Sequence, residues 1–289
     1  MKKVGKILLI LIVIALILAI AFITVNFAMS KVNKKGNPLV KIEFEGYGTV
    51  EIELYPDMAP NTVKNFIRLA QRGYYDGKTI TDIEDGLIRG GLVTTTNEAG
   101  ESVTEGAKLS NIKDLAENEE DKAYSIEGEF IQNGFNENTL SHSRGVISMY
   151  RSSYGQYQQE FAMVQMMGYG EYADTLYNEL YNSQSSGFFI LTEDNTGFDG
   201  TFTAFGKVTK GMEVVDAISK SELQKTTNES GVEETTTKPI TAPVINKVTV
   251  DTKGVDYGMP EYSEAFDFDE VFNMFMSSYM SSSGTTSSY

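Results

Sequence analysis

The sequence lacks cysteine and tryptophan and contains one histidine, His142, among 289 residues. The absence of cysteine excludes disulfide bonds, thiol catalysis and cysteine-ligated metal sites. One histidine cannot form a histidine-rich metal centre, and no HExxH, P-loop or GxGxxG motif is present. We therefore expect no metal and no cofactor. His142 is interpreted as a structural residue because it has no acidic neighbour in the sequence.

Basic side chains are also scarce, since 24 Lys and Arg stand against 40 Asp and Glu, for a net charge of −16. Residues 1–35 hold six of the lysines and no acid, so the remainder carries 18 basic and 40 acidic side chains, a net charge of −22. A body this acidic is repelled by phosphate backbones, which argues against nucleic acid as a partner. Hydrophobic residues make up 41% of the chain, enough for a sizeable core.

Charged residues are absent from Ile7–Met29, a run of 23 residues. A helix of that length crosses the ~30 Å hydrocarbon core of a bilayer. A cleaved signal peptide is the alternative, although a cut after Ala28 would put Asn26 where a small residue is required. We expect a transmembrane anchor within residues 1–29 and a tether at 30–37. The main domain would then lie outside the cytoplasm of a single-pass cell-membrane protein.

Alternation of apolar and polar residues dominates the body of the chain. Residues 39–55 alternate on both sides of a glycine-rich turn, which predicts a β-hairpin. Helical stripes predict one helix at 59–73 and a second at 211–219, and 220–239 is expected to be a polar loop. Strands with two distant helices favour a closed antiparallel barrel capped by helices. Further strands are expected at 86–91, 144–150, 186–192, 203–208 and 245–250.

Two insertions and a tail interrupt this pattern. Residues 94–122 are acidic and polar and are expected to form a long loop. Residues 154–181 are rich in Tyr, Met and Gln with helix-like spacing, which indicates either a packed helical hairpin or a client-binding surface. The tail, 251–289, is acidic and Ser-rich, and its segment 263–280 predicts an amphipathic helix.

Six motifs occur in a recognisable order: "GTVEIELYPDMAPNTVKNFIRLAQRGYYDG", "IRGG", "GEFIQNGF", "RGVISMYR", "SGFFI" and "FDGTFTAFGKVTKGMEVVDAI". Over residues 38–250 the chain resembles the cyclophilin family of peptidyl-prolyl cis-trans isomerases. The resemblance implies a mainly-β fold, a closed eight-stranded antiparallel barrel with two capping helices. It also implies a reaction at X-Pro peptide bonds.

Isomerisation of an X-Pro bond must cross a rotation barrier of ~18–20 kcal/mol, and no covalent bond is broken. A catalyst needs an apolar pocket for the proline ring and a donor near the proline nitrogen, where resonance is lost in the twisted state. In cyclophilins the donor is the arginine of a Phe-His-Arg segment. A glutamine just before a Gly-Gly pair supports that arginine.

This sequence departs from the family pattern at several of those positions. The donor position falls on Thr81, the supporting glutamine is replaced by Arg89, and a pocket phenylalanine is replaced by Gly86. A second glutamine is replaced by Gly187. The candidate substrate-binding residues are Leu87, Tyr150, Arg151, Phe189, Phe198 and Phe202.

Arg89 is the candidate catalytic residue, as a donor relocated from the neighbouring position. The alternative is an exposed strand arginine paired with Asp82, Glu84 or Asp85, since charged side chains are mostly solvated. Arg151 is either a second cationic contact or a charge at the rim of the site.

The sequence therefore favours a membrane-anchored isomerase that acts on extended Pro-containing segments of exported proteins, with weakened activity. One alternative is a catalytically inactive cyclophilin-like module that binds Pro-containing peptides or protein partners at the cell surface. Another is a structural surface protein in which the barrel is only a scaffold. The loss of the usual arginine and of both glutamines favours the binding module, whereas Leu87 and Phe189 suit either function.

Overall fold

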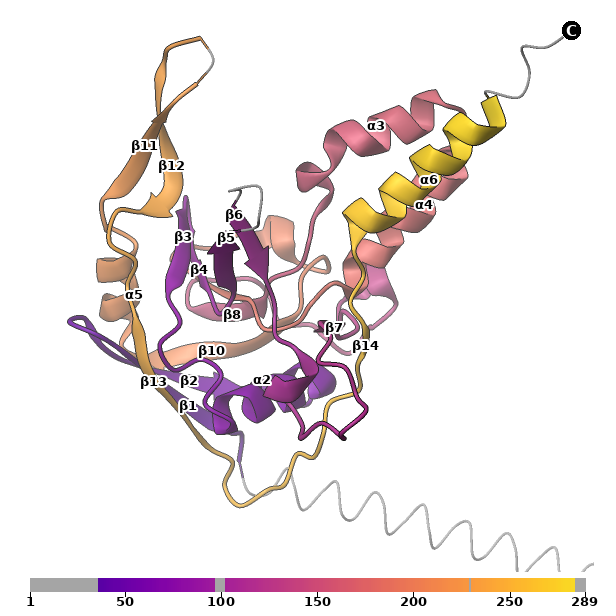
Figure 1. Cartoon of the computed structure of the whole chain (residues 1–289). Helices are drawn as coiled ribbons and strands as arrows, with labels where there is room; N and C mark the ends of the chain where they lie inside the picture. The colour runs from indigo at the N-terminus through magenta and orange to yellow at the C-terminus, as the bar shows by residue number, and fades with distance from the viewer. Residues whose placement is uncertain (1–35, 97–101, 229, 284–289) are drawn as a thin grey trace, which may run out of the picture.

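One antiparallel sheet of eight strands forms the centre of the computed structural model, which describes residues 36–96, 102–228 and 230–283 (Figure 1). The strands lie in the order β13–β1–β2–β10–β8–β9–β4–β3. Their bounds are β1 (Leu39–Phe44), β2 (Gly48–Leu54), β3 (Ile80–Glu84), β4 (Leu87–Gly90), β8 (Val146–Met149), β9 (Phe188–Leu191), β10 (Ala204–Lys210) and β13 (Ile245–Asp251).

The sheet curls into a half-barrel, and the expectation of a closed barrel is wrong. The edge strands β3 and β13 share no ladder in the described part of the chain. Hydrogen bonds join the two strands only at their first residues, with Ile80 N to Pro243 O at 2.9 Å and Gly77 N to Ile245 O at 2.8 Å. Pro243 has no N–H to donate, so regular pairing cannot continue through it.

Two helices cover the interior of the sheet. They are α2 (Pro60–Gln71), which has its proline in the first turn, and α5 (Met212–Ile218). Side chains from both helices join the strands in one hydrophobic core. The helical residues of that core are Val63, Phe66, Ile67, Leu69, Ala70, Val214, Val215 and Ile218.

Polar segments that were expected to be loops form hairpins instead. Residues 220–239 contain β11 (Leu223–Thr227) and β12 (Glu233–Pro239), and the expected loop at 94–122 contains β6 (Ser102–Glu105), which pairs with β5 (Val93–Thr96). These segments are rich in threonine, which is polar but β-branched and therefore suits a strand. Hydrophobic alternation could not predict them. Short elements complete this part of the fold: β7 (Tyr124–Ser125), η1 (Leu109–Asn111) and η2 (Ile131–Asn133).

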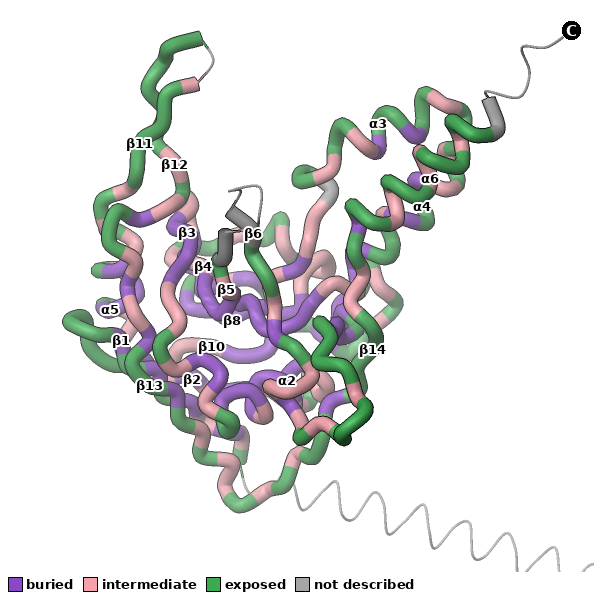
Figure 2. Tube along the Cα trace, viewed as in Figure 1, coloured by how far each residue is buried: buried purple, intermediate pink, exposed green. Residues whose placement is uncertain are grey.

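A group of helices projects beside the sheet, opposite the β11–β12 hairpin (Figure 1). Residues 154–181 form η3 (Tyr154–Gln156), α3 (Gln158–Met166) and α4 (Gly170–Glu179), followed by η4 (Leu180–Asn182). The tail pairs with β7 through β14 (Ser263–Glu264) and then forms α6 (Phe268–Ser283) against the other two helices. Buried residues are concentrated in the sheet, while the β11–β12 hairpin and the projecting helices α3, α4 and α6 are largely exposed (Figure 2).

None of the helices in the described ranges is both long and apolar enough to cross a bilayer. The segment Ile7–Met29, for which a transmembrane helix is expected, lies outside those ranges.

Candidate active site

The outer face of the sheet brings together the residues that the sequence singled out. Side chains alternate between the two faces of a strand, and residues that pair directly across strands share a face. On β4, Ile88 points into the core, so Leu87 and Arg89 point outward. Arg89 pairs with Phe189 of β9, and both side chains therefore project from the same outer face.

Two carboxylates hold the guanidinium of Arg89. Its Nε and Nη2 lie 3.2 and 3.1 Å from Asp82 Oδ2, and Nη2 is 3.1 Å from Glu84 Oε1. The guanidinium also stacks over the ring of Tyr150, 4.4 Å from its centre. The ion pairs expected for a surface arginine are present, but the side chain is only 19% exposed.

Asp82 is the centre of this charge network. Its carboxylate is 5% exposed and also accepts from Lys238 Nζ at 2.9 Å and Thr237 Oγ1 at 2.8 Å, both on β12. Burial raises the pKa of Asp82, but the hydrogen bonds from Lys238 and Arg89 outweigh it and lower the pKa to about 2. Burial opposes the charge of Arg89, and the hydrogen bond to Asp82 more than compensates and raises its pKa. The network therefore stays fully charged at neutral pH.

Three phenylalanine rings form an apolar cluster beside Arg89. The ring centre of Phe189 lies 5.6 Å from that of Phe198 and 5.4 Å from that of Phe202. Phe189 is 3% exposed, whereas the other two are partly exposed at the surface. Leu87 and Tyr150 pack into the same cluster. The five apolar candidates from the sequence thus lie together and form an aromatic surface.

His142 lies behind this cluster in a chain of hydrogen bonds that runs from the buried Ser148 to Asp199 at the surface. Its ring stacks on Phe189 at 6.4 Å, its Nδ1 lies 3.0 Å from Asp199 Oδ1, and its Nε2 lies 3.0 Å from Ser148 Oγ. Burial lowers the pKa of His142, and the pKa of Asp199 is also lowered. A neutral ring therefore donates from Nδ1 to the carboxylate and accepts from the serine hydroxyl.

The order Ser–His–Asp resembles that of a hydrolase triad. Ser148 is fully buried and His142 is 1% exposed, so no acyl group can reach the hydroxyl. The chain of hydrogen bonds instead fixes the position of Phe189 from behind. The sequence could not suggest it, because Asp199 lies 57 residues from His142.

Arg151 is buried and is not at the rim of the site. Its residue exposure is 4%, and its Nε and Nη1 donate to the carbonyls of Thr201 (2.9 Å) and Ser152 (2.8 Å). The guanidinium lies over the ring of Phe202, 4.7 Å from its centre, and over two further rings. Burial lowers its pKa. Arg151 thus supports Phe202 from behind and does not present its charge to solvent.

The departures from the family pattern have local structural reasons. Gly86 closes the turn between β3 and β4 with φ +84°, a conformation that a side chain would strain. A Cβ at Gly187 would lie 2.8 Å from the side chain of Leu92, which fills the space of a glutamine. Thr81 occupies a bulge in β3, 8% exposed, with Oγ1 3.4 Å from the carbonyl of Arg89.

A groove of about 420 Å³ adjoins the site. Arg89, Tyr150 and Gly187 line it, together with Tyr157 and Phe266. Gln156 also lines the groove, and its Nε2 donates to Tyr150 Oη at 2.9 Å. The sequence did not point to Gln156, and it indicated Asp82 only as a possible partner of Arg89. The visible signal for a larger role of Asp82 is its place directly before Ile83 in the strand "ITDIE".

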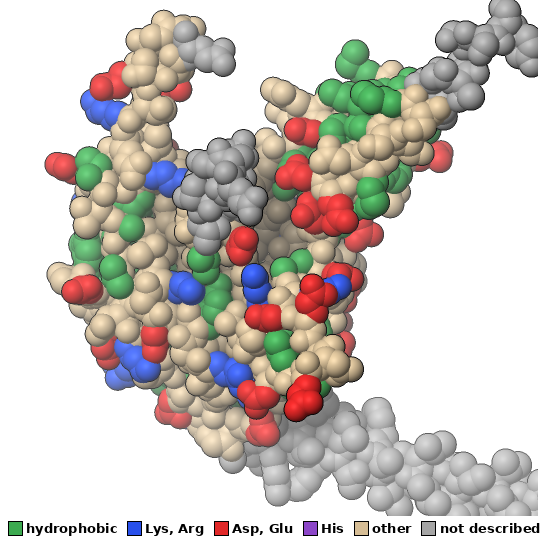
Figure 3. Space-filling view, in the orientation of Figure 1, with side chains coloured by type: hydrophobic (Ala, Val, Ile, Leu, Met, Phe, Trp, Pro, Cys, Tyr) green, Lys and Arg blue, Asp and Glu red, His purple; other side chains and the backbone are tan. Residues whose placement is uncertain are grey.

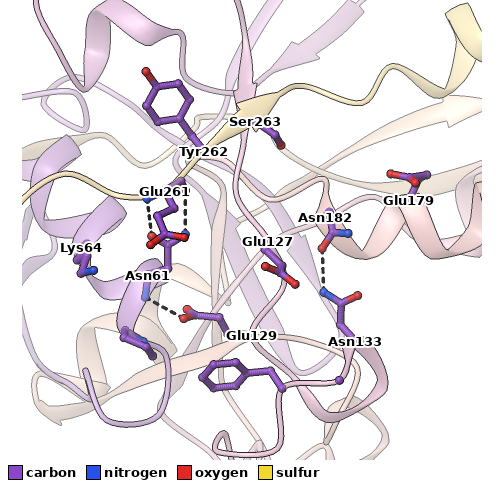
Figure 4. Close-up of a pocket in the computed structure, with 13 residues that line it drawn as sticks. Asn61, Lys64, Glu127, Glu129, Asn133, Glu179, Asn182, Glu261, Tyr262 and Ser263 are labelled. Atoms are coloured by element: carbon purple, nitrogen blue, oxygen red, sulfur yellow. Dashed lines mark hydrogen bonds between the residues drawn. The ribbon is translucent and has the colours of Figure 1, made fainter. Parts of the chain in front are cut away.

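A second cavity, of about 600 Å³, contains none of the candidate residues (Figure 4). Glu129 lies in it and accepts from the backbone N–H groups of Asn61 and Thr62, both at 2.8 Å, at the start of α2. A carboxylate there satisfies helix N–H groups and complements the helix dipole, so its role is structural. In the described part of the chain no three acidic or histidine side chains are grouped to hold a metal ion.

A family model for the cyclophilin type peptidyl-prolyl cis-trans isomerases matches residues 39–167 and 169–250. The chain belongs to this family. Isomerisation of X-Pro bonds is therefore its enzyme class.

Individual relatives agree with this placement. The chain is 30% identical over 169 residues to peptidyl-prolyl cis-trans isomerase-like 1 of Rhizopus delemar, covering 58% of this chain and 72% of the relative. It is 28% identical over 177 residues to peptidyl-prolyl cis-trans isomerase B of Bacillus subtilis, covering 61% and 87%. A cyclophilin type isomerase structure from Cryptosporidium parvum is similar with a TM-score of 0.48 and 20% identity, over 74% of this chain and 98% of that one.

Proposed function

We propose that this cyclophilin isomerises X-Pro bonds in extended segments of exported proteins, with Arg89 as a weakened donor. The observation that supports the proposal is the direct pairing of Arg89 with Phe189 across β4 and β9. This pairing sets a fixed positive charge beside an aromatic surface that suits a proline ring. No other chemical group is required, because the reaction is a rotation.

The mechanism follows from this arrangement. The proline ring packs on Phe189 and Phe202, and the flanking peptide lies along the groove past Tyr150. Arg89 donates to the prolyl peptide group as the C–N bond twists and the nitrogen gains a free lone pair. A donor that is oriented before the reaction stabilises the twisted state without reorganisation.

The same contacts explain a weakened activity. Asp82 and Glu84 already accept from the guanidinium, so part of its hydrogen-bonding capacity is used in the resting state. The family's usual donor position holds Thr81, whose hydroxyl is short and directed at the backbone. The ring centres of Phe198 and Phe202 lie 4.9 Å apart, so the two rings must separate to admit a proline ring between them.

Localisation outside the cytoplasm is part of the proposal. It rests on the uncharged run Ile7–Met29, which follows three lysines near the N-terminus. Clients would then be Pro-containing polypeptides that emerge from the membrane in an unfolded state.

A catalytically inactive module that binds Pro-containing peptides is the second candidate. The specific observation in its favour is the neutralisation of Arg89 by two carboxylates. Such a module would keep the aromatic surface for proline without stabilising the twisted state.

Protease-free isomerisation of a prolyl tetrapeptide, run beside a titration with the same peptide, separates these functions. Arg89→Gln is expected to lower kcat/KM about tenfold, which is less than the ~10²–10³-fold loss for a fully available donor. Arg89→Lys keeps the charge but loses the two parallel donors of the guanidinium. Its kcat/KM should therefore lie between those of the unmodified chain and Arg89→Gln. Arg144→Gln, at an exposed arginine paired with Asp216, is the control and should leave the rate unchanged.

Each outcome selects one function. Peptide binding without isomerisation would refute the enzyme proposal and favour the binding module. An unchanged rate in a folded Arg89→Gln variant would remove Arg89 from the mechanism. If the prolyl tetrapeptide does not bind at all, the sheet serves only as a structural scaffold.

A further inference from the structure

The helical arm consists of residues 157–182 and 266–283, which include α3, α4 and α6. It has a small core of its own, in which Phe268 of α6 packs on Phe161 of α3 with ring centres 5.2 Å apart. Phe275 of α6 stacks on Tyr172 of α4 at 4.9 Å. The tail helix is therefore part of the arm's folded structure. The buried residues of this small core are Phe161, Val164, Ala173, Leu176, Leu180 and Phe268.

The outer surface of the arm exposes several large apolar side chains. Met166 is 88% exposed, and exposed methionines lie on both α3 and α6. Figure 3 shows hydrophobic side chains on the surface of these two helices. Methionine is flexible and polarisable, so a surface rich in it adapts to varied apolar partners. The large apolar side chains exposed on the arm are Met163, Met166, Tyr169, Met274 and Met280.

The charge of the arm has one sign only. It contains seven acids and no Lys or Arg. Burial, together with the nearby Asp267 and Glu160, raises the pKa of Asp269, as expected where acids lack cations. Within the described residues none of the seven acids takes part in a salt bridge. The acids are Glu160, Glu171, Asp174, Glu179, Asp267, Asp269 and Glu270.

The arm begins at the groove of the candidate active site. Tyr157 and Phe266 are the first residues of its two segments, and both line that groove. Arg89 and Tyr150 line the same groove. A polypeptide that lies along the groove is therefore led to the base of the arm.

We propose that the helical arm binds unfolded polypeptide segments that combine apolar residues with Lys or Arg, whether or not they contain proline. The exposed methionines receive the apolar side chains, and the unpaired acids attract the basic ones. A second copy of the chain is a poorer partner, because seven like charges would face seven. An anionic membrane surface is repelled for the same reason. The binding goes beyond isomerisation and holds a client next to the groove.

The test uses the full chain and two fluorescein-labelled, proline-free peptides of 12 residues, one of Leu, Ser and Lys and one of Leu, Ser and Glu. Fluorescence anisotropy should detect binding of the Lys peptide at least tenfold tighter than binding of the Glu peptide. The Lys peptide should lose affinity as salt is raised from about 0.05 to 0.5 M, because the attraction is screened.

Matched variants locate the binding site. Met166→Ser combined with Met274→Ser should weaken binding of the Lys peptide about tenfold, in line with lost burial of apolar side chains. Val232→Ser combined with Ile240→Ser removes two other exposed apolar side chains, in the β11–β12 region, and should change nothing. Glu160→Gln combined with Asp174→Asn should reduce both the affinity and its salt dependence.

Several results would overturn the proposal. They are equal binding of the two peptides, binding unaffected by the methionine variant, or a sedimenting dimer that the same variant dissociates. Binding to anionic lipid vesicles that competes with the Lys peptide would also contradict it. Because these peptides lack proline, the proposal can fail while tetrapeptide isomerisation persists, and it can hold if isomerisation is absent.

Discussion

Substituting Asp82 by asparagine removes the charge at the centre of the network that holds Arg89. Asp82 is 5% exposed and binds Arg89, Lys238 and Thr237 at once. Its pKa is lowered from 3.8 to about 2, which at about 1.4 kcal/mol per unit corresponds to about 2.5 kcal/mol, or about 2 kcal/mol once solvent screening is allowed for. Asn has the same shape without the charge. Asp82→Asn is therefore expected to lower the free energy of unfolding by about 2 kcal/mol at pH 7.

The pH dependence provides a second measure of the same quantity. Because folding lowers the pKa of Asp82, the unfolded state takes up the proton first as the pH falls. The stabilisation is complete above pH 3.8 and is lost as the pH falls towards about 2. Urea unfolding between pH 7 and pH 2 should show the two proteins converging over that window. The variant should also isomerise a prolyl tetrapeptide faster, since only Glu84 then competes for Arg89.

Glu84→Gln is the control for this experiment. Glu84 makes one contact to Arg89 and is 37% exposed, so its loss should change the free energy of unfolding by less than ~1 kcal/mol. If Asp82→Asn and Glu84→Gln are equally stable at pH 7, the buried network does not stabilise the fold. If Asp82→Asn abolishes isomerisation in a folded protein, Asp82 positions Arg89 for the reaction and does not inhibit it.

Three further outcomes are expected. Adding Thr81→Arg to Arg89→Gln should raise tetrapeptide isomerisation above that of the unmodified chain, and a rate equal to that of Arg89→Gln would show that the bulge misdirects the new side chain. Because burial lowers the pKa of His142, the free energy of unfolding should fall as the pH drops below about 6.5. His142→Gln should lose this pH dependence, and a pH profile identical to that of the unmodified chain would contradict a buried neutral ring. Cell fractionation should find the full chain in the membrane, with residues 38–250 accessible to protease outside intact cells; a soluble product that begins near Met29 would identify Ile7–Met29 as a cleaved signal peptide.

Local pattern was sufficient for most of the sheet and its helices. Strands β1 and β2 alternate apolar and polar residues, and the period of two alone places Val40 and Ile42 in the core. Helix α2 begins at Pro60, where a proline removes no needed hydrogen bond. Such features depend on neighbours a few residues apart, and the sequence displays these directly.

The alternation of apolar and polar residues could not predict the strands in the threonine-rich polar segments. The strands of the β11–β12 hairpin are almost wholly exposed, so no hydrophobic period marks them. What stabilises them is backbone pairing and the contacts of Thr237 and Lys238 with Asp82, 155 and 156 residues away in the chain. Pairing between distant segments is a property of the folded chain.

The sequence by itself determined the family, most of the strands of the main sheet and the identity of the aromatic surface, because these depend on residue types in order. Only the tertiary structure decided which partners the charged side chains have and how deeply each is buried. It placed Arg89 beside Phe189 but between two acids, enclosed Arg151 among rings, and joined His142 to Asp199. Charge interactions weaken with distance and strengthen with burial, and both quantities exist only once the chain has folded.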